Sequence, residues 1–331
     1  MTGEVLLEAV DVVKHFALND LVFGSSGVIH AVDGVSVQLH QGEVLGIVGE
    51  SGCGKTTLSN MFMLLDDPTS GEIRWRGKNL ADFTKEERFK YRRAVQMVFQ
   101  DTFGSLNPRM TITDILTEPF TLHRDVLPKS EWDKKVRDLL LLVGLDPDHA
   151  NRYPHQFSGG QRQRIGIARA LALEPEVLVL DEPVSALDVS VQAQIINLLK
   201  ELQGRLGLSY IFVAHDLSVV RQIADRIVVM YLGEIMETGD EEQVLLHPSH
   251  PYTQALVSAL PTADATGAVT GKRIVLSGDL PSPANPPSGC RFRTRCWLAQ
   301  QICADKKPEL IDRGTGRPAA CHFVTPAVPA S

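Results

Sequence analysis

GESGCGKT, residues 49–56, is the stretch that decides the fold of this chain. It fits the pattern G-x-x-x-x-G-K-[ST], follows an apolar run at 45–48 that reads as a buried strand, and opens a helical pattern over 55–65. In this context the glycines allow backbone N–H groups to converge on phosphate oxygens, and the start of the helix adds partial positive charge. A chance glycine turn is the alternative, and the flanking strand and helix disfavour it. The sequence therefore predicts a phosphate-binding loop.

The side chains of this loop indicate which phosphate compound it holds. Lys55 is expected to reach the β- and γ-phosphates of a nucleotide, and the Thr56 hydroxyl to ligate Mg²⁺. Cys53 occupies a position that needs only a small residue with a backbone N–H, so we assign it no thiol chemistry.

Strands and helices alternate in the rest of the chain up to about residue 240. Buried strands are expected at 177–180, 210–214 and 227–231, and apolar residues recur at helical spacing between 191 and 206. Between 100 and 170 the pattern is mostly helical. One helix there is expected to be capped by Ser130, to end at Gly144, and to bury Trp132, Val136, Leu139, Leu140 and Val143. These patterns predict an α/β fold with a helical insert.

The composition changes after Pro261. DLPSPANPPSGC at 279–290 is too rich in proline for a helix or a central strand, so we expect 262–331 to be a loop-rich extension.

The overall composition is that of an ordinary soluble protein. The 331 residues are 44% hydrophobic and 22% charged, and the net charge of -7 gives no reason to expect nucleic-acid binding. No apolar run approaches the roughly 20 residues that span a bilayer, and the N-terminus lacks the features of a secretory signal. The chain is therefore expected in the cytoplasm, with any membrane role supplied by partners.

Two carboxylates follow the apolar run VLVL at 177–180. Asp181 is placed to hold the Mg²⁺ shell, and Glu182 to polarise an attacking water. An apolar run followed by Asp-Glu is common in strands that leave a core, so this prediction depends on the phosphate loop upstream.

FSGGQ at 157–161, followed by RQRIGIARA at 162–170, distinguishes this chain among phosphate-loop proteins. Ser158 is expected to cap a helix whose exposed N–H groups can bind an anion, although an ordinary N-cap before a flexible Gly-Gly is the alternative. The segment closely resembles the signature motif of the ABC ATPases, which contacts the γ-phosphate held by the opposite subunit. The resemblance implies a dimer with two composite ATP sites. It also implies an α/β P-loop NTPase core of the ABC ATPase type over 1–261, with an antiparallel β subdomain and a helical subdomain at about 101–172.

Other motifs of that family follow in the expected order, over residues of roughly 5 to 260. Gln100 resembles the Q-loop glutamine, SALD at 185–188 the D-loop, and His215 the switch histidine that contacts the γ-phosphate and positions the water. A lone histidine at a strand end is usually structural, so His215 gains its meaning from the set. Phe16 is the candidate for the aromatic that stacks on adenine, or else a core residue of the first strand.

The resemblance thus implies catalytic roles for Glu182, His215 and Gln100, and Mg²⁺ ligation by Thr56, Gln100 and Asp181. Within one subunit, the residues implied to bind ATP are Phe16, Gly49, Ser51, Gly52, Cys53, Gly54, Lys55, Thr56 and Thr57. From the opposite subunit they are Ser158, Gly160, Gln161 and Asp188.

Three longer segments resemble the oligopeptide/dipeptide importer subfamily: QDTFGSLNPRM at 100–110, HPYTQAL at 250–256 and PSPANPPSGC at 281–290. The Phe-Gly of the first segment is more like the F-type ATPase of these importers. The resemblance implies ATP-driven import of di- or oligopeptides at the cytoplasmic face of the cell membrane. The implied partners are a D-type ATPase subunit in a heterodimer, two transmembrane permease subunits and an extracytoplasmic substrate-binding protein. Nickel and glutathione systems share the subfamily, and a soluble regulatory ABC ATPase is the alternative from another class.

Four cysteines lie in the C-terminal extension with the spacing C-x5-C-x6-C-x17-C. Four thiolates can hold an iron–sulfur cluster or a structural zinc, and free thiols are the third possibility. The positions match those that bind a 4Fe–4S cluster in related dipeptide importers, which favours that cluster over zinc. Neighbouring arginines at 291, 293 and 295 are expected to favour the thiolates, and His322 is an alternative ligand. The expected ligands are Cys290, Cys296, Cys303 and Cys321.

Overall fold

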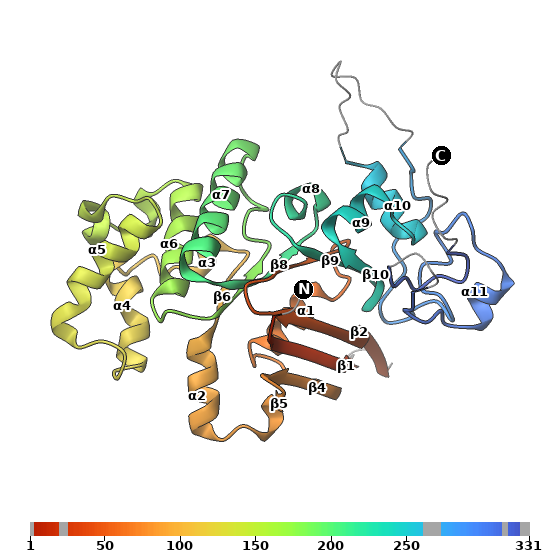
Figure 1. Ribbon diagram of the computed structural model, residues 1–331, viewed down its shortest axis with the longest axis horizontal. Helices are drawn as coiled ribbons and strands as arrows, with labels where there is room; N and C mark the ends of the chain where they lie inside the picture. The colour runs from red at the N-terminus through yellow and green to blue at the C-terminus, as the bar shows by residue number, and fades with distance from the viewer. Residues whose placement is uncertain (1–2, 20–25, 261–272, 313–316, 325–331) are drawn as a thin grey trace, which may run out of the picture. The chain divides into compact units, whose positions relative to one another are not determined.

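The computed structural model describes residues 3–19, 26–260, 273–312 and 317–324 (Figure 1). The residues group into two compact units. The helix-rich unit is mainly Asp82–Val213, and the strand-rich unit contains Val5–Leu39, Val44–Ala81 and most of the chain after Ala214. The predicted boundary between 261 and 262 lies outside the described residues.

Three parallel strands form the sheet of the helix-rich unit. Val95 pairs with Val177, and Val177 pairs with Ser209, so β7 lies between β6 and β8. All five residues of β7 are buried, as expected for a strand covered on both faces. The strands predicted at 177–180 and 210–214 are confirmed. The bounds are β6 (Val95–Val98), β7 (Val177–Asp181) and β8 (Ser209–Ala214).

The helices α4, α5 and α6 of this unit pack on one another around a leucine- and isoleucine-rich core. Leu116, Leu140 and Ile165 come from the three helices in turn and are fully buried. The helices are α2 (Lys85–Ala94), α3 (Thr102–Ser105), α4 (Ile112–Leu122), α5 (Trp132–Leu142), α6 (Gly159–Leu171) and α7 (Val189–Leu206). Short 3-10 turns are η2 (Lys129–Glu131), η3 (Pro147–Asn151) and η4 (Pro154–Gln156).

The start of α5 differs from the prediction. Ser130 lies inside the 3-10 turn η2, and Glu131 is the N-cap of α5 without a side-chain cap hydrogen bond. Pro128 precedes this turn, and Trp132 donates a hydrogen bond from its indole nitrogen to the carbonyl of Leu127 at 3.3 Å. This local turn replaces the expected cap, so the assignment of Ser130 was wrong. The end of the helix is as predicted, because Gly144 is left-handed with φ 70°.

An antiparallel sheet of order β2-β1-β4-β5 belongs to the strand-rich unit. Leu7 of β1 pairs with Trp75 of β4, and the register shifts between Val10 and Val13. This sheet is the antiparallel β subdomain that the sequence resemblance implied. The bounds are β1 (Val5–Asn19), β2 (Ser26–His40), β4 (Ser70–Trp75) and β5 (Lys78–Asn79), followed by the 3-10 turn η1 (Leu80–Asp82).

A second group of strands in this unit carries the phosphate loop. Strand β3 pairs in parallel with β9, which pairs antiparallel with β10. Helix α1 follows β3 and is three residues shorter than predicted, because Leu64 adopts a left-handed φ of 54°. The bounds are β3 (Val44–Val48), α1 (Lys55–Phe62), α8 (Leu217–Val220), β9 (Arg226–Tyr231), β10 (Glu234–Asp240), α9 (Glu241–Leu246) and α10 (Pro251–Ser258).

The described part of the C-terminal extension, 273–312 and 317–324, is built mostly of loops. Its one regular helix among those residues is α11 (Gln301–Asp305). Phe292 is fully buried, with its ring centroid 5.3 Å from those of Tyr231 and Tyr252. Isolated bridges join Ala319 to Glu237 and to Ile311. The extension is therefore anchored on the strand-rich unit through a few buried contacts rather than through a core of its own.

Within the described ranges, no helix is both long enough and apolar enough to traverse a lipid bilayer.

Candidate active site

The phosphate loop connects β3 to α1. Two of its glycines lie so close to the backbone of other strands that no side chain would fit there. Gly54 has φ 102°, and a Cβ there would lie 2.1 Å from the carbonyl oxygen of Ala31. A Cβ on Gly49 would lie 2.2 Å from the carbonyl oxygen of Met230. Side chains at these two positions would push the loop away from the strands that support it.

The first turn of α1 is suited to an anion. Its N-cap, Gly54, supplies no side-chain hydrogen bond, and no acidic residue lies in the first turn. The first N–H groups of a helix have no partner within the helix, so they can bind phosphate oxygens. Lys55 is 4% exposed and donates hydrogen bonds from Nζ to the carbonyls of Gly49 at 2.7 Å and Glu50 at 3.0 Å. Thr56 is exposed at the helix start.

The four other positions near this lysine that are predicted to bind ATP differ in their exposure to solvent. Cys53 is buried, with Sγ 3.7 Å from the Nζ of Lys55, and burial raises the pKa of its thiol. This environment suits a small packing residue. Ser51 and Gly52 are exposed at the tip of the loop, and Thr57 is half-buried.

The C-terminal extension contacts the phosphate loop directly, a feature that the sequence analysis missed. Arg295 Nη1 donates a hydrogen bond to Glu50 Oε2 at 2.6 Å, and its guanidinium lies 5.9 Å from the ring centroid of Tyr231. The backbone N–H of Glu50 donates to the Tyr252 hydroxyl at 2.9 Å. Tyr252 lies in the segment HPYTQAL, and Arg295 directly precedes Cys296. Both were visible in the sequence, but nothing in their spacing linked them to residue 50.

In the helix-rich unit, the structure brings two predicted catalytic residues together. Gln100 Nε2 donates a hydrogen bond to Glu182 Oε2 at 2.9 Å. Glu182 has a left-handed φ of 45°, while its N–H donates to the carbonyl of Val213 at 2.9 Å. Such a conformation is strained for a residue with a side chain, and strain of this kind is concentrated at functional sites. Asp181, the last residue of β7, is 3% exposed.

The signature segment begins α6 as predicted. Ser158 Oγ accepts a hydrogen bond from Gln161 N at 3.3 Å, and Gln161 Oε1 accepts one from Ser158 N at 3.0 Å. This reciprocal pair is a capping box. It confirms Ser158 as the N-cap.

The two glycines after Ser158 pack against the D-loop region. A Cβ on Gly160 would lie 2.5 Å from a methyl carbon of Val191, and one on Gly159 would lie 3.3 Å from Leu187. Asp188 lies between these two partners, is exposed, and is the N-cap of α7 without a side-chain cap hydrogen bond. The signature and D-loop segments therefore form one packed element.

Two further predicted residues lie in the strand-rich unit. His215 is exposed between β8 and α8, and the following Asp216 caps α8 through a 2.7 Å hydrogen bond from Ser218 N. Phe16 is 36% exposed on β1, and Lys14 Nζ lies 4.9 Å from its ring centroid. An exposed ring does not suit the alternative that Phe16 is a core residue of the first strand.

The four cysteines of the extension influence one another. Cys290, Cys303 and Cys321 are buried, Cys296 is half-buried, and Cys290 N donates to the carbonyl of Cys303 at 2.7 Å. Burial raises the pKa of Cys290 to about 12, and the three other thiols raise it as well. Neutral thiols in such a cluster would become thiolates on binding a metal.

The arginines beside these cysteines do not have the expected role. Arg291 pairs with Asp33 and, at 2.8 Å, with Glu234. Arg295 pairs with the phosphate loop, and Arg293 Nε donates to a backbone carbonyl at 2.9 Å. The pKa values of Cys290 and Cys296 are raised, chiefly by burial, so the expectation that these arginines favour thiolates was wrong.

Comparisons with known proteins agree with these features. The ABC transporter family model matches residues 32–185, and the model of the oligopeptide/dipeptide transporter C-terminal region matches residues 236–303. The oligopeptide transport ATP-binding protein AppF of Bacillus subtilis is 52% identical over 97% of this chain and 98% of its own length. The dipeptide transport ATP-binding protein DppF of Haemophilus influenzae is 46% identical, covering 98% of this chain and 100% of its own.

A solved structure shows the same fold. The ATP-binding cassette MJ0796, described as dimeric in a post-hydrolysis state bound to ADP and Pi, matches with a TM-score of 0.63 and 32% identity. The match covers 71% of this chain and 99% of the other. The chain belongs to the ABC transporter family and is one of its ATP-hydrolysing subunits of the oligopeptide/dipeptide transporter type.

Proposed function

We propose that this chain binds Mg-ATP as one half of a two-subunit nucleotide sandwich and couples its hydrolysis to import of di- or oligopeptides. The phosphate loop carries this proposal, because a Cβ on Gly54 or Gly49 would lie 2.1 or 2.2 Å from a backbone carbonyl oxygen and its helix start has no side-chain cap. The names of the relatives, which are oligopeptide and dipeptide transport ATP-binding proteins, support the choice of solute.

In this proposal the strand-rich unit binds the nucleotide. The N–H groups of the loop 49–56 hold the phosphates, and Lys55 exchanges its carbonyl partners for phosphate oxygens. Phe16 offers an exposed ring for the adenine. Thr56, Asp181 and Gln100 would hold Mg²⁺, which supplies neutralisation of the phosphate charge.

Glu182 is proposed as the residue that orients and polarises water. Its hydrogen bond with Gln100 positions the carboxylate, and its left-handed φ fixes the backbone from which the carboxylate projects. His215, exposed after β8, is proposed to contact the γ-phosphate.

A second ATPase subunit would complete each site. Ser158, Gly160 and Gln161 at the start of α6, with Asp188, are proposed to meet the nucleotide of the opposite subunit, since Ser158 is exposed and the first N–H groups of a helix have no partner within the helix. The dimeric form of the matched cassette supports this arrangement. The corresponding domains are the nucleotide-binding domain 1–261, with a helical subdomain at about 101–172, and the extension 262–331.

The proposed partners are those of a peptide importer. They are a D-type ATPase subunit in a heterodimer, two transmembrane permeases and an extracytoplasmic binding protein, with this chain at the cytoplasmic face of the membrane. The match to the oligopeptide/dipeptide C-terminal region supports this assembly. Nickel or glutathione import is the alternative with the same machinery. Reconstitution with the permeases in vesicles should give peptide-dependent ATP hydrolysis; stimulation by nickel or glutathione alone would select the alternative.

We also propose that Cys290, Cys296, Cys303 and Cys321 hold a 4Fe–4S cluster, with zinc as the alternative. The mutual effect of the four thiols on their pKa values supports a shared metal site. A tetrahedral zinc with 2.3 Å bonds needs thiolates about 3.8 Å apart. Among the described residues, the only group of three potential metal ligands within 4.8 Å of one another contains no cysteine. The preference for a cluster follows the resemblance of the four positions to the cluster-binding cysteines of related dipeptide importers.

Iron analysis and a visible absorption spectrum of anaerobically purified protein test this assignment. Iron with a broad absorption band is expected, and zinc without iron would contradict it.

The test of the hydrolytic role is Glu182→Gln. We expect ATP turnover to fall by about 10²–10⁴-fold, the usual contribution of a general base, while ATP binding persists. Steady-state hydrolysis and equilibrium binding of ATP measure the two effects. Glu201→Gln on the exposed face of α7 is the control and should hydrolyse ATP normally. Near-normal turnover in Glu182→Gln would remove this residue from its role.

A further inference from the structure

We propose that His15, His30 and Asp33 form a binding site for a divalent transition-metal ion on the antiparallel sheet. The site uses none of the cysteines of the extension and none of the residues 49–56 of the phosphate loop. It does not depend on the proposed function.

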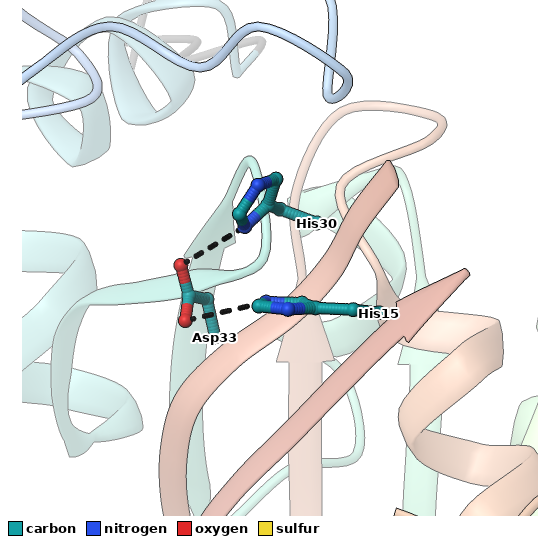
Figure 2. Close-up of side chains that lie close together, drawn as sticks. All are labelled: His15, His30 and Asp33. Atoms are coloured by element: carbon teal, nitrogen blue, oxygen red, sulfur yellow. Dashed lines mark ion pairs between the residues drawn. The ribbon is translucent and has the colours of Figure 1, made fainter. Parts of the chain in front are cut away.

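The three side chains converge from two neighbouring strands. His15 lies on β1, and His30 and Asp33 lie on β2, which is adjacent to β1 in the sheet. Figure 2 shows the two imidazole rings facing the carboxylate. The ring centroids are 4.2 Å apart, and one ligand atom from each residue lies within 4.8 Å of the other two. Neighbouring strands hold such a constellation more rigidly than loops would.

The distances suit a shared cation better than direct hydrogen bonds. His15 Nε2 lies 3.6 Å from Asp33 Oδ1, and His30 Nδ1 lies 3.7 Å from Asp33 Oδ2. Both distances exceed the range of a hydrogen bond. Both nitrogens are buried atoms without a hydrogen-bond partner, which is costly for a polar group. A tetrahedral ion with bonds of about 2.0–2.2 Å would separate its ligand atoms by about 3.4 Å, so only small movements are needed.

The donor set selects the class of metal. Two imidazole nitrogens and one carboxylate suit Zn²⁺, Co²⁺, Ni²⁺ or Cu²⁺, whereas Mg²⁺ and Ca²⁺ prefer oxygen ligands. Burial lowers the pKa of His30, with a further lowering from His15, so its ring is neutral and available as a ligand at neutral pH. The side chains of the three residues are 27–30% exposed, so an ion can enter from solvent.

One cation already contacts the site. Arg291 of the extension donates a hydrogen bond to Asp33 Oδ2, and Glu234, 2.8 Å from Arg291, balances part of its charge. A bound metal would share Asp33 with this arginine. Metal binding and the anchoring of the extension are therefore linked through one carboxylate.

Titration of the full-length protein with Co²⁺ tests the proposal. Calorimetry measures affinity, and absorption distinguishes the ligands, because thiolate ligands add intense near-ultraviolet charge-transfer bands while imidazole and carboxylate ligands give only weak visible bands. Removal of a second-shell partner alone costs 10–100-fold in affinity, so His15→Gln and His30→Gln should each weaken this site about tenfold or more. The visible absorption bands of bound Co²⁺ should weaken together with the affinity, while any near-ultraviolet band stays unchanged. His247→Gln, at an exposed histidine on another element, is the control and should bind Co²⁺ as the unaltered chain does.

A second measurement needs no variant. Carbethoxylation of the unaltered chain, mapped by peptide mass spectrometry, should show His15 and His30 protected by Co²⁺ and His247 equally labelled with and without it. Unchanged affinity in both variants, or equal labelling of His15 and His30 in either condition, would overturn the proposal.

Discussion

The phosphate loop and the C-terminal extension lie in the same unit but are held in place by different means. Gly49 and Gly54 are fixed by backbone contacts that exclude any Cβ. The extension instead depends on long side chains, because Arg291 and Arg295 pair with carboxylates of the strand-rich unit and Phe292 is buried against two tyrosines. The loop thus depends on close backbone approach to Ala31 and Met230, whereas the extension depends on ion pairs between its arginine side chains and carboxylates such as Asp33 and Glu50.

The two regions are therefore expected to lose their structure through different kinds of change. Changes of backbone conformation should disable the loop, and changes of charge should loosen the extension. Two substitutions and one change of pH test this contrast.

Gly54→Ala should have the largest effect. The new Cβ would lie 2.1 Å from the Ala31 carbonyl oxygen, so the loop must move, and we expect ATP binding to be lost. The left-handed φ alone costs about 1–3 kcal/mol. Gly77→Ala is the matched control, since Gly77, between β4 and β5, has φ 79° but no atom within 4 Å of the added Cβ. Equilibrium binding of ATP to both variants measures the difference, and equal loss of binding in the two would show that the clash is irrelevant.

Lowering the pH should destabilise the folded protein through His250, which packs near Phe292 of the extension. This residue is 1% exposed, its Nδ1 accepts the Tyr252 N–H at 3.0 Å, and its ring lies 5.7 Å from that of Phe292. Burial lowers its pKa from 6.5 to about 3. As the pH falls, His250 is therefore protonated near pH 6.5 in the unfolded chain but only near pH 3 in the folded chain. The resulting stability is complete above pH 6.5 and is lost as the pH falls through this window, by about 2 kcal/mol between pH 7 and pH 5.

Urea unfolding at pH 7 and pH 5 measures this loss. His250→Asn keeps a side chain that can cap α10 but does not titrate, so its free energy of unfolding should change less between the two pH values by about 2 kcal/mol. The same pH dependence in both proteins would contradict the prediction.

Arg295→Gln should have the smallest effect. It removes the 2.6 Å pair with Glu50, whose side chain is 29% exposed and therefore partly screened by water, so we expect a loss of about 1 kcal/mol in the free energy of unfolding. A double-mutant cycle with Glu50→Gln isolates the pair. Arg293→Gln, which removes only hydrogen bonds within the extension, is the control. ATP affinity should weaken in Arg295→Gln and not in Arg293→Gln; equal affinities would separate the extension from the loop.

The sequence predicted best those features whose chemistry is local. The phosphate loop and the Ser158 cap are read from residues within eight positions of one another, and both lie where they were expected. The cap at Ser130 failed because Pro128 and a 3-10 turn compete for the same backbone. The roles of Arg291 and Arg295 failed because their carboxylate partners are distant in sequence. His15 and His30 were invisible for the same reason, since only the pairing of β1 with β2 brings them together.

The close packing of Gly160 on Val191 has a consequence for how two such subunits would communicate. A Cβ at residue 160 would meet Val191, so the starts of α6 and α7 are in close contact and we expect Ser158 and Asp188 to move together. At an interface with a neighbouring subunit, the two segments would therefore shift position as one element rather than independently. A larger residue at 160 would push the two segments apart and let them move separately, although every polar group would still be present.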